Sequence, residues 1–137
     1  NKPYLIGAHV SEGIKLPSGE NISKIITTID HKNLLGIILS CVSPENYEKN
    51  LNEIKSLGVP FGFKLNGFIT TKPTSGYTNT FNKSKSGNPN EFLGHREDLI
   101  PEKMALIAKK FKEAGATILG GCCETRPSHI KEMAKLK

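Results

Sequence analysis

The 137-residue sequence contains no apolar run that approaches the roughly 20 residues of a membrane-spanning helix. It also shows no charged and then apolar leader of the kind that directs secretion. We therefore expect a soluble, cytoplasmic protein that does not act in a membrane.

Arginine is scarce, although the net charge is +6. Arg96 and Arg126 are the two arginines, and most of the positive charge comes from lysines on the polar faces of amphipathic segments. No aromatic residues are interleaved with these lysines, as a nucleic-acid surface would require. We interpret the lysines as solvated helix faces and expect no nucleic-acid partner.

Four short apolar runs alternate with segments of helical periodicity. The runs predict strands at Tyr4 to Ala8, Gly36 to Ser40, Phe61 to Leu65 and Thr117 to Leu119. Predicted inward positions of the four helices are Ile22, Ile25, Ile26 and Ile29; Tyr47, Leu51, Ile54 and Leu57; Met104, Ile107, Ala108 and Phe111; and Ile130, Met133 and Ala134. Ser43 and Pro44 are expected to begin the second helix, and Pro101 and Pro127 the third and fourth.

This β-α order predicts an α/β fold with parallel strands and right-handed crossovers. Periodicity alone allows either an open doubly wound sheet or part of a (β/α)8 barrel, and a whole barrel needs about twice this length. The chain begins at Asn1, without methionine, and enters an apolar run at once. We interpret it as one domain-sized part of a longer protein.

One connection, residues 67–98, is much longer than the others. It is rich in Gly, Asn, Ser, Thr and Pro, has no helical or strand period, and follows the third predicted strand. That position lies at the carboxyl end of the sheet, where barrels and doubly wound folds build their active sites. A mobile insert and a lid or subunit contact both fit, and Tyr77, Phe81 and Phe92 favour an ordered loop.

The sequence has three cysteines, each close to the end of a predicted strand. An odd number without a secretion signal argues against a structural disulfide. Cys41, Cys122 and Cys123 can be small buried hydrophobes, a redox pair with a third thiol, or three thiolate ligands of a catalytic zinc site, which keeps its fourth position open. The glycines Gly120 and Gly121 are expected to allow the turn that brings adjacent thiols together.

Several other polar residues are weaker candidates. His9 and Asn66 end the first and third predicted strands, and Glu20 precedes the first helix, so each could contact a substrate at the carboxyl end of the sheet. A satisfied histidine, a turn-forming asparagine and a helix-terminal carboxylate are the plainer alternatives. The remaining histidines are interpreted as surface groups: His31, His95 and His129.

Three segments resemble the homocysteine S-methyltransferase family. "GGCCETRPSHI" is similar to the segment that ends the family's barrel, "SCVSPENYEKNL" to the segment with its first zinc cysteine, and "PSGENISKII" to the turn after its fifth strand. The likeness runs in order over the whole chain, and a long connection after the seventh strand favours the betaine-homocysteine methyltransferase branch. Ser40 and Glu124 depart from the asparagine and glycine common in the family.

The resemblance implies strands five to eight of a (β/α)8 barrel, so that residues 1–137 are the C-terminal half of a homocysteine-binding domain. It implies Zn²⁺ held by Cys41, Cys122 and Cys123, and methyl transfer from an onium donor such as betaine or S-methylmethionine to zinc-bound homocysteine, forming methionine. It also implies a homo-oligomer for the complete protein and no activity for this part alone. A non-catalytic zinc-binding half-barrel and a thiol redox module remain the alternatives.

Overall fold

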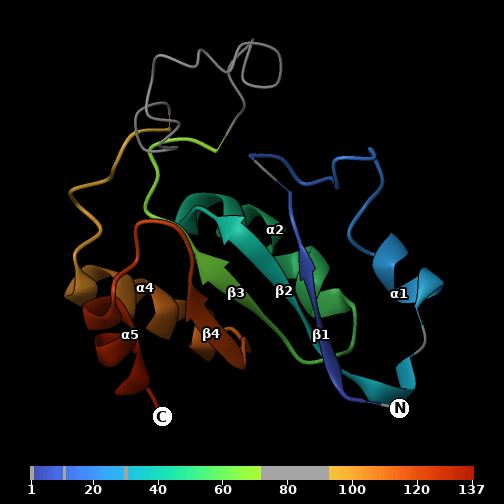
Figure 1. Cartoon of the computed structure of the whole chain (residues 1–137). Helices are drawn as coiled ribbons and strands as arrows, with labels where there is room; N and C mark the ends of the chain where they lie inside the picture. The colour runs from blue at the N-terminus through green and yellow to red at the C-terminus, as the bar shows by residue number, and fades with distance from the viewer. Residues whose placement is uncertain (1, 11, 30, 72–92) are drawn as a thin grey trace.

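The computed structural model describes residues 2–10, 12–29, 31–71 and 93–137. Its four strands form one parallel sheet in chain order, as Figure 1 shows. The strands are β1 (Tyr4–Ala8), β2 (Leu34–Val42), β3 (Phe61–Leu65) and β4 (Ile118–Gly121). Sequential order is the arrangement of consecutive βα units in a barrel, whereas a doubly wound sheet reverses its order at a switch point. The predicted α/β fold and its parallel strands are confirmed.

The four predicted helices are present, and Figure 1 shows α2, α4 and α5 on one side of the sheet. They are α1 (Lys24–Thr28), α2 (Pro44–Ser56), α4 (Pro101–Glu113) and α5 (Pro127–Ala134), and a 3-10 turn, η1, covers His31–Asn33. The first helix is shorter than its apolar face predicts. Its sequence, Lys-Ile-Ile-Thr-Thr, is rich in β-branched residues, which lose side-chain freedom in a helix and lower its stability.

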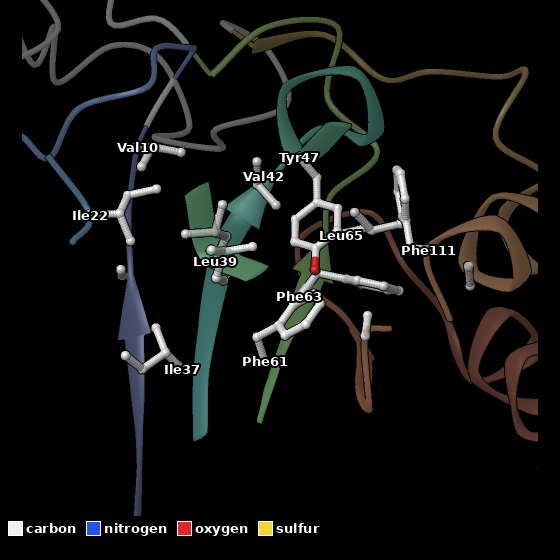
Figure 2. Packing of buried hydrophobic residues seen from close by; sticks show 14 of the residues in the cluster. Val10, Ile22, Ile37, Leu39, Val42, Tyr47, Phe61, Phe63, Leu65 and Phe111 are labelled. Atoms are coloured by element: carbon white, nitrogen blue, oxygen red, sulfur yellow. The ribbon is translucent and has the colours of Figure 1, made fainter. Parts of the chain in front are cut away.

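The core lies between the sheet and these helices. Ile37, Leu39, Phe63 and Leu65 point from β2 and β3 toward Tyr47 of α2 and Phe111 of α4, and all six are fully or almost fully buried. The three aromatic rings pack edge to face, with centroids 4.7 to 5.7 Å apart (Figure 2). This packing fixes α2 and α4 against β3, so the strand ends beside them are held firmly.

The opposite face of the sheet is covered by none of the described helices. Alternation along the strands places Gly7, Ile38, Gly62 and Ile118 in one row across that face. Leu5, two positions before Gly7, leaves 47% of its surface exposed. Two of these four residues are glycines, and at Gly62 the neighbouring strand lies very close: a Cβ added to Gly62 would lie 1.8 Å from the carbonyl oxygen of Ile118.

The long connection is closed at its base by a short antiparallel bridge between Phe68 and His95. The amide of Arg96 donates to the carbonyl of Gly67 at 2.8 Å, and the amide of Ile69 donates to the carbonyl of Gly94 at 3.1 Å. The prediction that residues 67–98 contain no regular structure is therefore wrong at this bridge. Tyr77, Phe81 and Phe92, the aromatic residues that favoured an ordered loop, lie outside the described residues.

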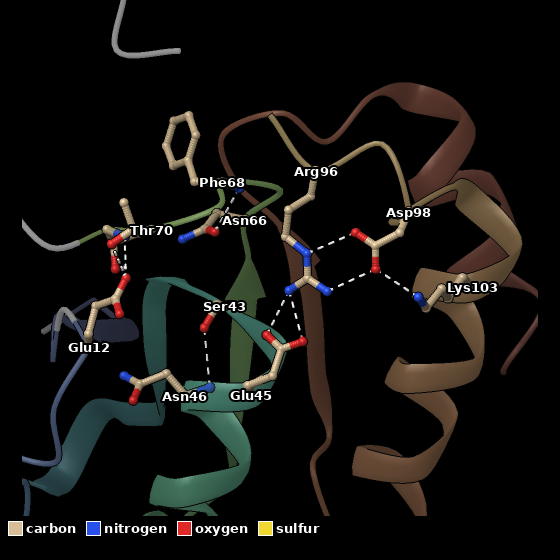
Figure 3. Close-up of polar contacts among 11 residues, drawn as sticks. Glu12, Ser43, Glu45, Asn46, Asn66, Phe68, Thr70, Arg96, Asp98 and Lys103 are labelled. Carbon is tan, nitrogen blue, oxygen red and sulfur yellow. Dashed lines mark hydrogen bonds and ion pairs between the residues drawn. The ribbon is translucent and has the colours of Figure 1, made fainter. Parts of the chain in front are cut away.

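Arg96 joins the end of this connection directly to α2 and, through Asp98, to α4 (Figure 3). Its guanidinium donates to both carboxylate oxygens of Glu45, at 2.8 and 2.7 Å, and in a bidentate pair to Asp98, which also accepts from Lys103. Burial raises the pKa of the Glu45 carboxyl, but the hydrogen bond from Arg96 and its charge lower that pKa by more, so the net shift is downward.

No described helix is both long and apolar enough to cross a bilayer.

Candidate metal centre

Three thiols from two distant parts of the chain meet near the carboxyl ends of the strands. The Sγ atoms of Cys41 and Cys123 lie 3.7 Å apart, those of Cys122 and Cys123 lie 3.9 Å apart, and all three lie within 4.8 Å of one another. All three thiols are free. Tetrahedral zinc with Zn–S bonds of about 2.3 Å places its sulfur ligands about 3.8 Å apart. The spacing of these thiols therefore suits a tetrahedral metal ion.

Cys41 reaches this position through a β-bulge. Ser40 pairs with Lys64 and Val42 with Leu65, so Cys41 is an extra residue in β2 that no residue of β3 opposes. Its φ of 53° lies in the left-handed region, which costs a residue with a side chain about 1 to 2 kcal/mol. Cys41 thus lies within β2, not beyond its end as the apolar run predicted. The bulge also appears in the core, where the inward positions of β2 run 37, 39 and then 42.

Cys122 and Cys123 lie in a tight turn directly after β4. The amide of Cys122 donates to the carbonyl of Leu65 at 2.7 Å, which extends the pairing with β3. The carbonyl of Cys123 accepts from the amide of Gly67 at 3.0 Å, and Thr125 donates through its amide and its hydroxyl to the carbonyl of Cys122. Backbone hydrogen bonds on both sides therefore fix the two neighbouring thiols.

The two glycines before this turn have different surroundings. A Cβ added to Gly121 would lie 2.3 Å from Oγ1 of Thr125, whereas one added to Gly120 would meet nothing closer than 3.5 Å. The left-handed residue of the turn is Glu124, with a φ of 63°, and neither glycine has a positive φ. Neither glycine therefore uses the backbone angles that favour glycine, and the space for a side chain at position 121 is taken by Thr125.

Cys41 and Cys123 favour their protonated form when no cation is present. The pKa of Cys41 is raised to about 12. The largest cause is burial, followed by the hydrogen bond with Cys122 and by the charge of Cys122. Burial and the charge of Cys122 also raise the pKa of Cys123. Three thiolates this close together repel one another, and a divalent cation supplies the opposite charge that removes this repulsion.

Asn66 is the predicted candidate that the structure brings to the thiols. Its side chain is fully buried at the end of β3, and its Nδ2 lies 3.8 Å from Sγ of Cys41, in position to donate a hydrogen bond. Its Oδ1 accepts from the amide of Phe68 at 3.1 Å, which fixes the orientation of the amide group (Figure 3). Such an outer hydrogen bond orients a metal ligand and tunes its charge.

The contacts of the other two candidates are with residues outside the cluster. His9 is exposed, and its Nδ1 lies 3.2 Å from the carbonyl oxygen of Ser40, the residue before Cys41. Glu20 is exposed and accepts a hydrogen bond from Ser18. Contact of His9, Glu20 or Asn66 with a substrate stays a prediction.

One histidine was assigned to the wrong environment. His31 and His95 are exposed as predicted, but His129 is buried at the start of α5. Its Nδ1 accepts from the amide of Arg126 at 3.0 Å, and its Nε2 lies 2.9 Å from the carbonyl oxygen of Leu99. Because an amide only donates and a carbonyl only accepts, the ring carries its proton on Nε2. His129 therefore caps the helix and joins it to the segment before α4.

A parallel βα sheet with three converging thiols at its carboxyl edge defines the class of an α/β fold whose thiols could hold a metal ion. A profile of the family described as homocysteine S-methyltransferase matches residues 1–136. Homocysteine S-methyltransferase 1 of Saccharomyces cerevisiae is 30% identical to this chain, and the match covers 98% of this chain. The Zea mays protein of the same name is 27% identical over 91% of this chain, and that of Arabidopsis thaliana is 26% identical over 90% of this chain. The chain belongs to the homocysteine S-methyltransferase family, and the predicted resemblance is confirmed. It spans 39%, 35% and 34% of the length of these relatives, respectively.

Proposed function

We propose that the complete protein transfers a methyl group to the sulfur of homocysteine at a zinc site formed by Cys41, Cys122 and Cys123. The observation that carries this proposal is the triangle of three sulfur atoms, whose 3.7 and 3.9 Å edges suit tetrahedral zinc. Membership of the family supports homocysteine as the methyl acceptor. The three thiolates would hold zinc with one position free for homocysteine, and zinc would supply the positive charge that favours the deprotonated, nucleophilic form of the homocysteine thiol.

The residues of this chain hold the three ligands in place. The bulge turns Cys41 toward the turn after β4, and Asn66 donates a hydrogen bond to its sulfur. Thr125 and Gly67 fix the carbonyl groups of Cys122 and Cys123, so both side chains keep their direction. Cys41 and Cys122 are partly buried, whereas Cys123 is exposed. The cluster is therefore open to solvent on the side of Cys123, where a substrate could approach.

We further propose that residues 1–137 form strands five to eight of a (β/α)8 barrel and that the other half supplies the remaining substrate contacts. The methyl donor is an onium compound such as betaine or S-methylmethionine. The homocysteine sulfur attacks the methyl carbon while the bond from that carbon to the donor's nitrogen or sulfur breaks, so the donor leaves as a neutral amine or sulfide. The sulfur ends as the thioether of methionine, and no oxidant or reductant is required.

Metal analysis and activity of the complete protein test this proposal. We expect one zinc per chain, intense thiolate-to-metal absorption after cobalt substitution, and loss of at least nine tenths of both bound metal and methyl transfer in each Cys→Ser variant. Glu48→Gln, which alters an exposed ion pair with Lys110, is the control that should behave like the wild type.

Two other results would support the alternative functions. Stoichiometric zinc without methyl transfer to homocysteine from any onium donor would indicate a non-catalytic zinc-binding protein. Absence of metal together with a reversible disulfide between Cys122 and Cys123 would indicate a redox module. Full activity of metal-free protein or of Cys41→Ser would show that the thiols are not the reaction centre.

A further inference from the structure

Glu124, which directly follows the adjacent thiols, holds a backbone conformation that disfavours its own side chain. Its φ of 63° lies in the left-handed region, and a residue other than glycine loses about 1 to 2 kcal/mol there. Some interaction of the folded protein must therefore hold Glu124 in this conformation. Its carboxylate shows one: Oε2 lies 2.9 Å from Nδ1 of His95, and the side chain of Glu124 is only 16% exposed.

His95 belongs to the strand-like segment that closes the long connection, so this pair joins two separate parts of the chain. A Cβ added to Gly67 would lie 2.9 Å from Cβ of Glu124, which shows that Glu124 packs directly over Gly67. The amide of Gly67 donates to the carbonyl of Cys123, and its carbonyl accepts from the amide of Arg96. The thiol turn is thus attached to the segment around His95 by backbone bonds through Gly67 and by the Glu124–His95 pair.

We propose that the Glu124–His95 pair is a positioning device for Cys123. This inference rests on the metal centre proposed above. The pair holds residue 124 in the left-handed region, and this fixes the peptide unit between Cys123 and Glu124. With that unit fixed, the carbonyl of Cys123 points to Gly67, and Sγ of Cys123 stays 3.7 Å from Sγ of Cys41. Without the pair, rotation of this peptide would carry the Cys123 thiol away from the triangle.

Substitutions at position 124 separate positioning from backbone strain and from charge. Glu124→Gly accepts the left-handed backbone without cost but lacks the contact, so a strain effect alone predicts unchanged or tighter metal binding. Glu124→Gln keeps an oxygen that can accept from the His95 ring but removes the negative charge. Glu124→Ala loses the contact and keeps the strain.

The readouts are zinc affinity, measured by competition with a chromophoric chelator, and the visible spectrum of the Co²⁺-substituted complete protein. We expect Glu124→Gln to bind zinc within about threefold of the wild type, and both Glu124→Gly and His95→Ala to bind it about tenfold more weakly, the lower end of outer-contact effects on metal affinity. Glu124→Ala and His95→Ala both lose the contact and keep the backbone strain at residue 124, so both should bind zinc at least as weakly as Glu124→Gly. The double variant Glu124→Gly with His95→Ala should be no weaker than either single variant, because both remove the same contact.

The control is Glu48→Gln, because Glu48 forms an exposed ion pair with Lys110 that lies between α2 and α4. A role confined to stability would lower the melting temperature of the position 124 variants and leave the cobalt spectrum unchanged, so a shift of the ligand-field bands in folded protein identifies positioning. Circular dichroism confirms that each variant is folded before its affinity is compared.

Wild-type affinity and an unchanged cobalt spectrum in Glu124→Gly or His95→Ala would overturn the inference. A Glu124→Gln protein as weak as Glu124→Gly would also overturn it, because charge would then be responsible. These results differ from failure of the metal centre itself, in which Cys123→Ser would bind zinc as tightly as the wild type.

Discussion

Cys41 shows how one extra residue in a strand can create a site. Side chains alternate along β2, and regular pairing would give position 41 the same direction as Ile37 and Leu39, into the core. The bulge removes Cys41 from that alternation and returns Val42 to the core, where it is 1% exposed. The left-handed conformation of Cys41 is unfavourable by itself and is maintained by the surrounding packing. Strained backbone conformations and β-bulges of this kind are common at functional positions.

The contact between Gly121 and Thr125 gives a prediction for the metal centre. In Gly121→Val the new side chain must displace Thr125, whose hydroxyl donates to the carbonyl of Cys122 at 2.5 Å. We expect zinc affinity to fall at least tenfold, a larger effect than the accompanying loss of global stability. Chelator competition and urea unfolding of the complete protein measure the two quantities separately.

Gly120→Ala is the matched control for this substitution. Its added Cβ meets Cγ of Lys64 and the carbonyl oxygen of Phe63 at 3.5 Å, which is ordinary van der Waals contact. We expect zinc affinity close to that of the wild type. Unchanged metal content in a folded Gly121→Val protein would show that the Thr125 contact does not control the direction of the thiols.

The protonation of the thiols predicts how metal binding depends on pH. Because the pKa of Cys41 is raised to about 12, this thiol keeps its proton in metal-free protein throughout the neutral range. Zinc binding must release that proton, so zinc affinity should rise with pH, by about tenfold per unit for each proton released. Competition titrations at pH 6, 7 and 8, corrected for protonation of the chelator, give the slope. An affinity independent of pH would contradict thiol ligation.

The residues that the sequence predicted well are those whose chemistry depends on their own type and spacing. Cys41, Cys122 and Cys123 were recognisable because each follows an apolar run, and parallel strands place their carboxyl ends together. The Asn66–Cys41 contact and the burial of His129 were not predictable, because each depends on a partner at least 25 positions away. Sequence patterns reveal periodicity, whereas these contacts arise from tertiary packing.

At the scale of elements, the beginning of α2 was predictable from local sequence alone. Ser43 precedes Pro44, and its hydroxyl oxygen accepts from the amide of Asn46 at 3.2 Å, as predicted for a capping serine. Ser43→Ala should lower the free energy of unfolding by about 1 kcal/mol, because this amide loses its partner at the helix terminus. Urea unfolding of the complete protein measures the change.

Ser23 provides the comparison for this prediction. It precedes α1, but its side chain makes no capping hydrogen bond. Ser23→Ala should therefore change the free energy of unfolding by less than about 0.5 kcal/mol, the range for surface substitutions away from specific contacts. Equal losses from the two variants would show that the capping bond of Ser43 contributes nothing.

Elements with strong periodicity and clear boundaries were predicted closely, and weaker ones were not. Pro101 begins α4 and Pro127 begins α5 as predicted, because proline suits the first turn of a helix. The Phe68–His95 bridge joins the two ends of a connection that has no strand period, so no local pattern indicates it. His95 and Glu124 are also far apart along the chain, so no local pattern indicates their ion pair.

At the scale of the whole molecule, the sheet has two outer strands and one open face. β1 and β4 each pair on one side only within the described chain, and Leu5 is half exposed on the face opposite the helices. Unpaired strand edges and exposed apolar surface promote association. The 137-residue chain produced alone should therefore dimerise, aggregate or remain partly molten, and should not methylate homocysteine even where it retains zinc.

Size-exclusion chromatography with a homocysteine methylation assay tests this prediction. Mixing the chain with a separately produced amino-terminal half should restore turnover, because the two sheets would close a barrel whose strands have no free edges. A stable monomer that methylates homocysteine would show that this chain is already a complete enzyme.

The triangle of thiols also has a consequence for chain topology. Cys41 and Cys123 are separated by 82 positions. An ion bound to both therefore closes a loop that contains α2, β3, α4 and β4. A covalent cross-link over about 100 residues reduces the entropy of the unfolded chain by the equivalent of about 4 to 5 kcal/mol, and a metal clip acts in the same direction for as long as it stays bound. The ligands of the reaction centre would then serve as a reversible cross-link, so a chelator that removes the ion would weaken resistance to heat together with catalysis.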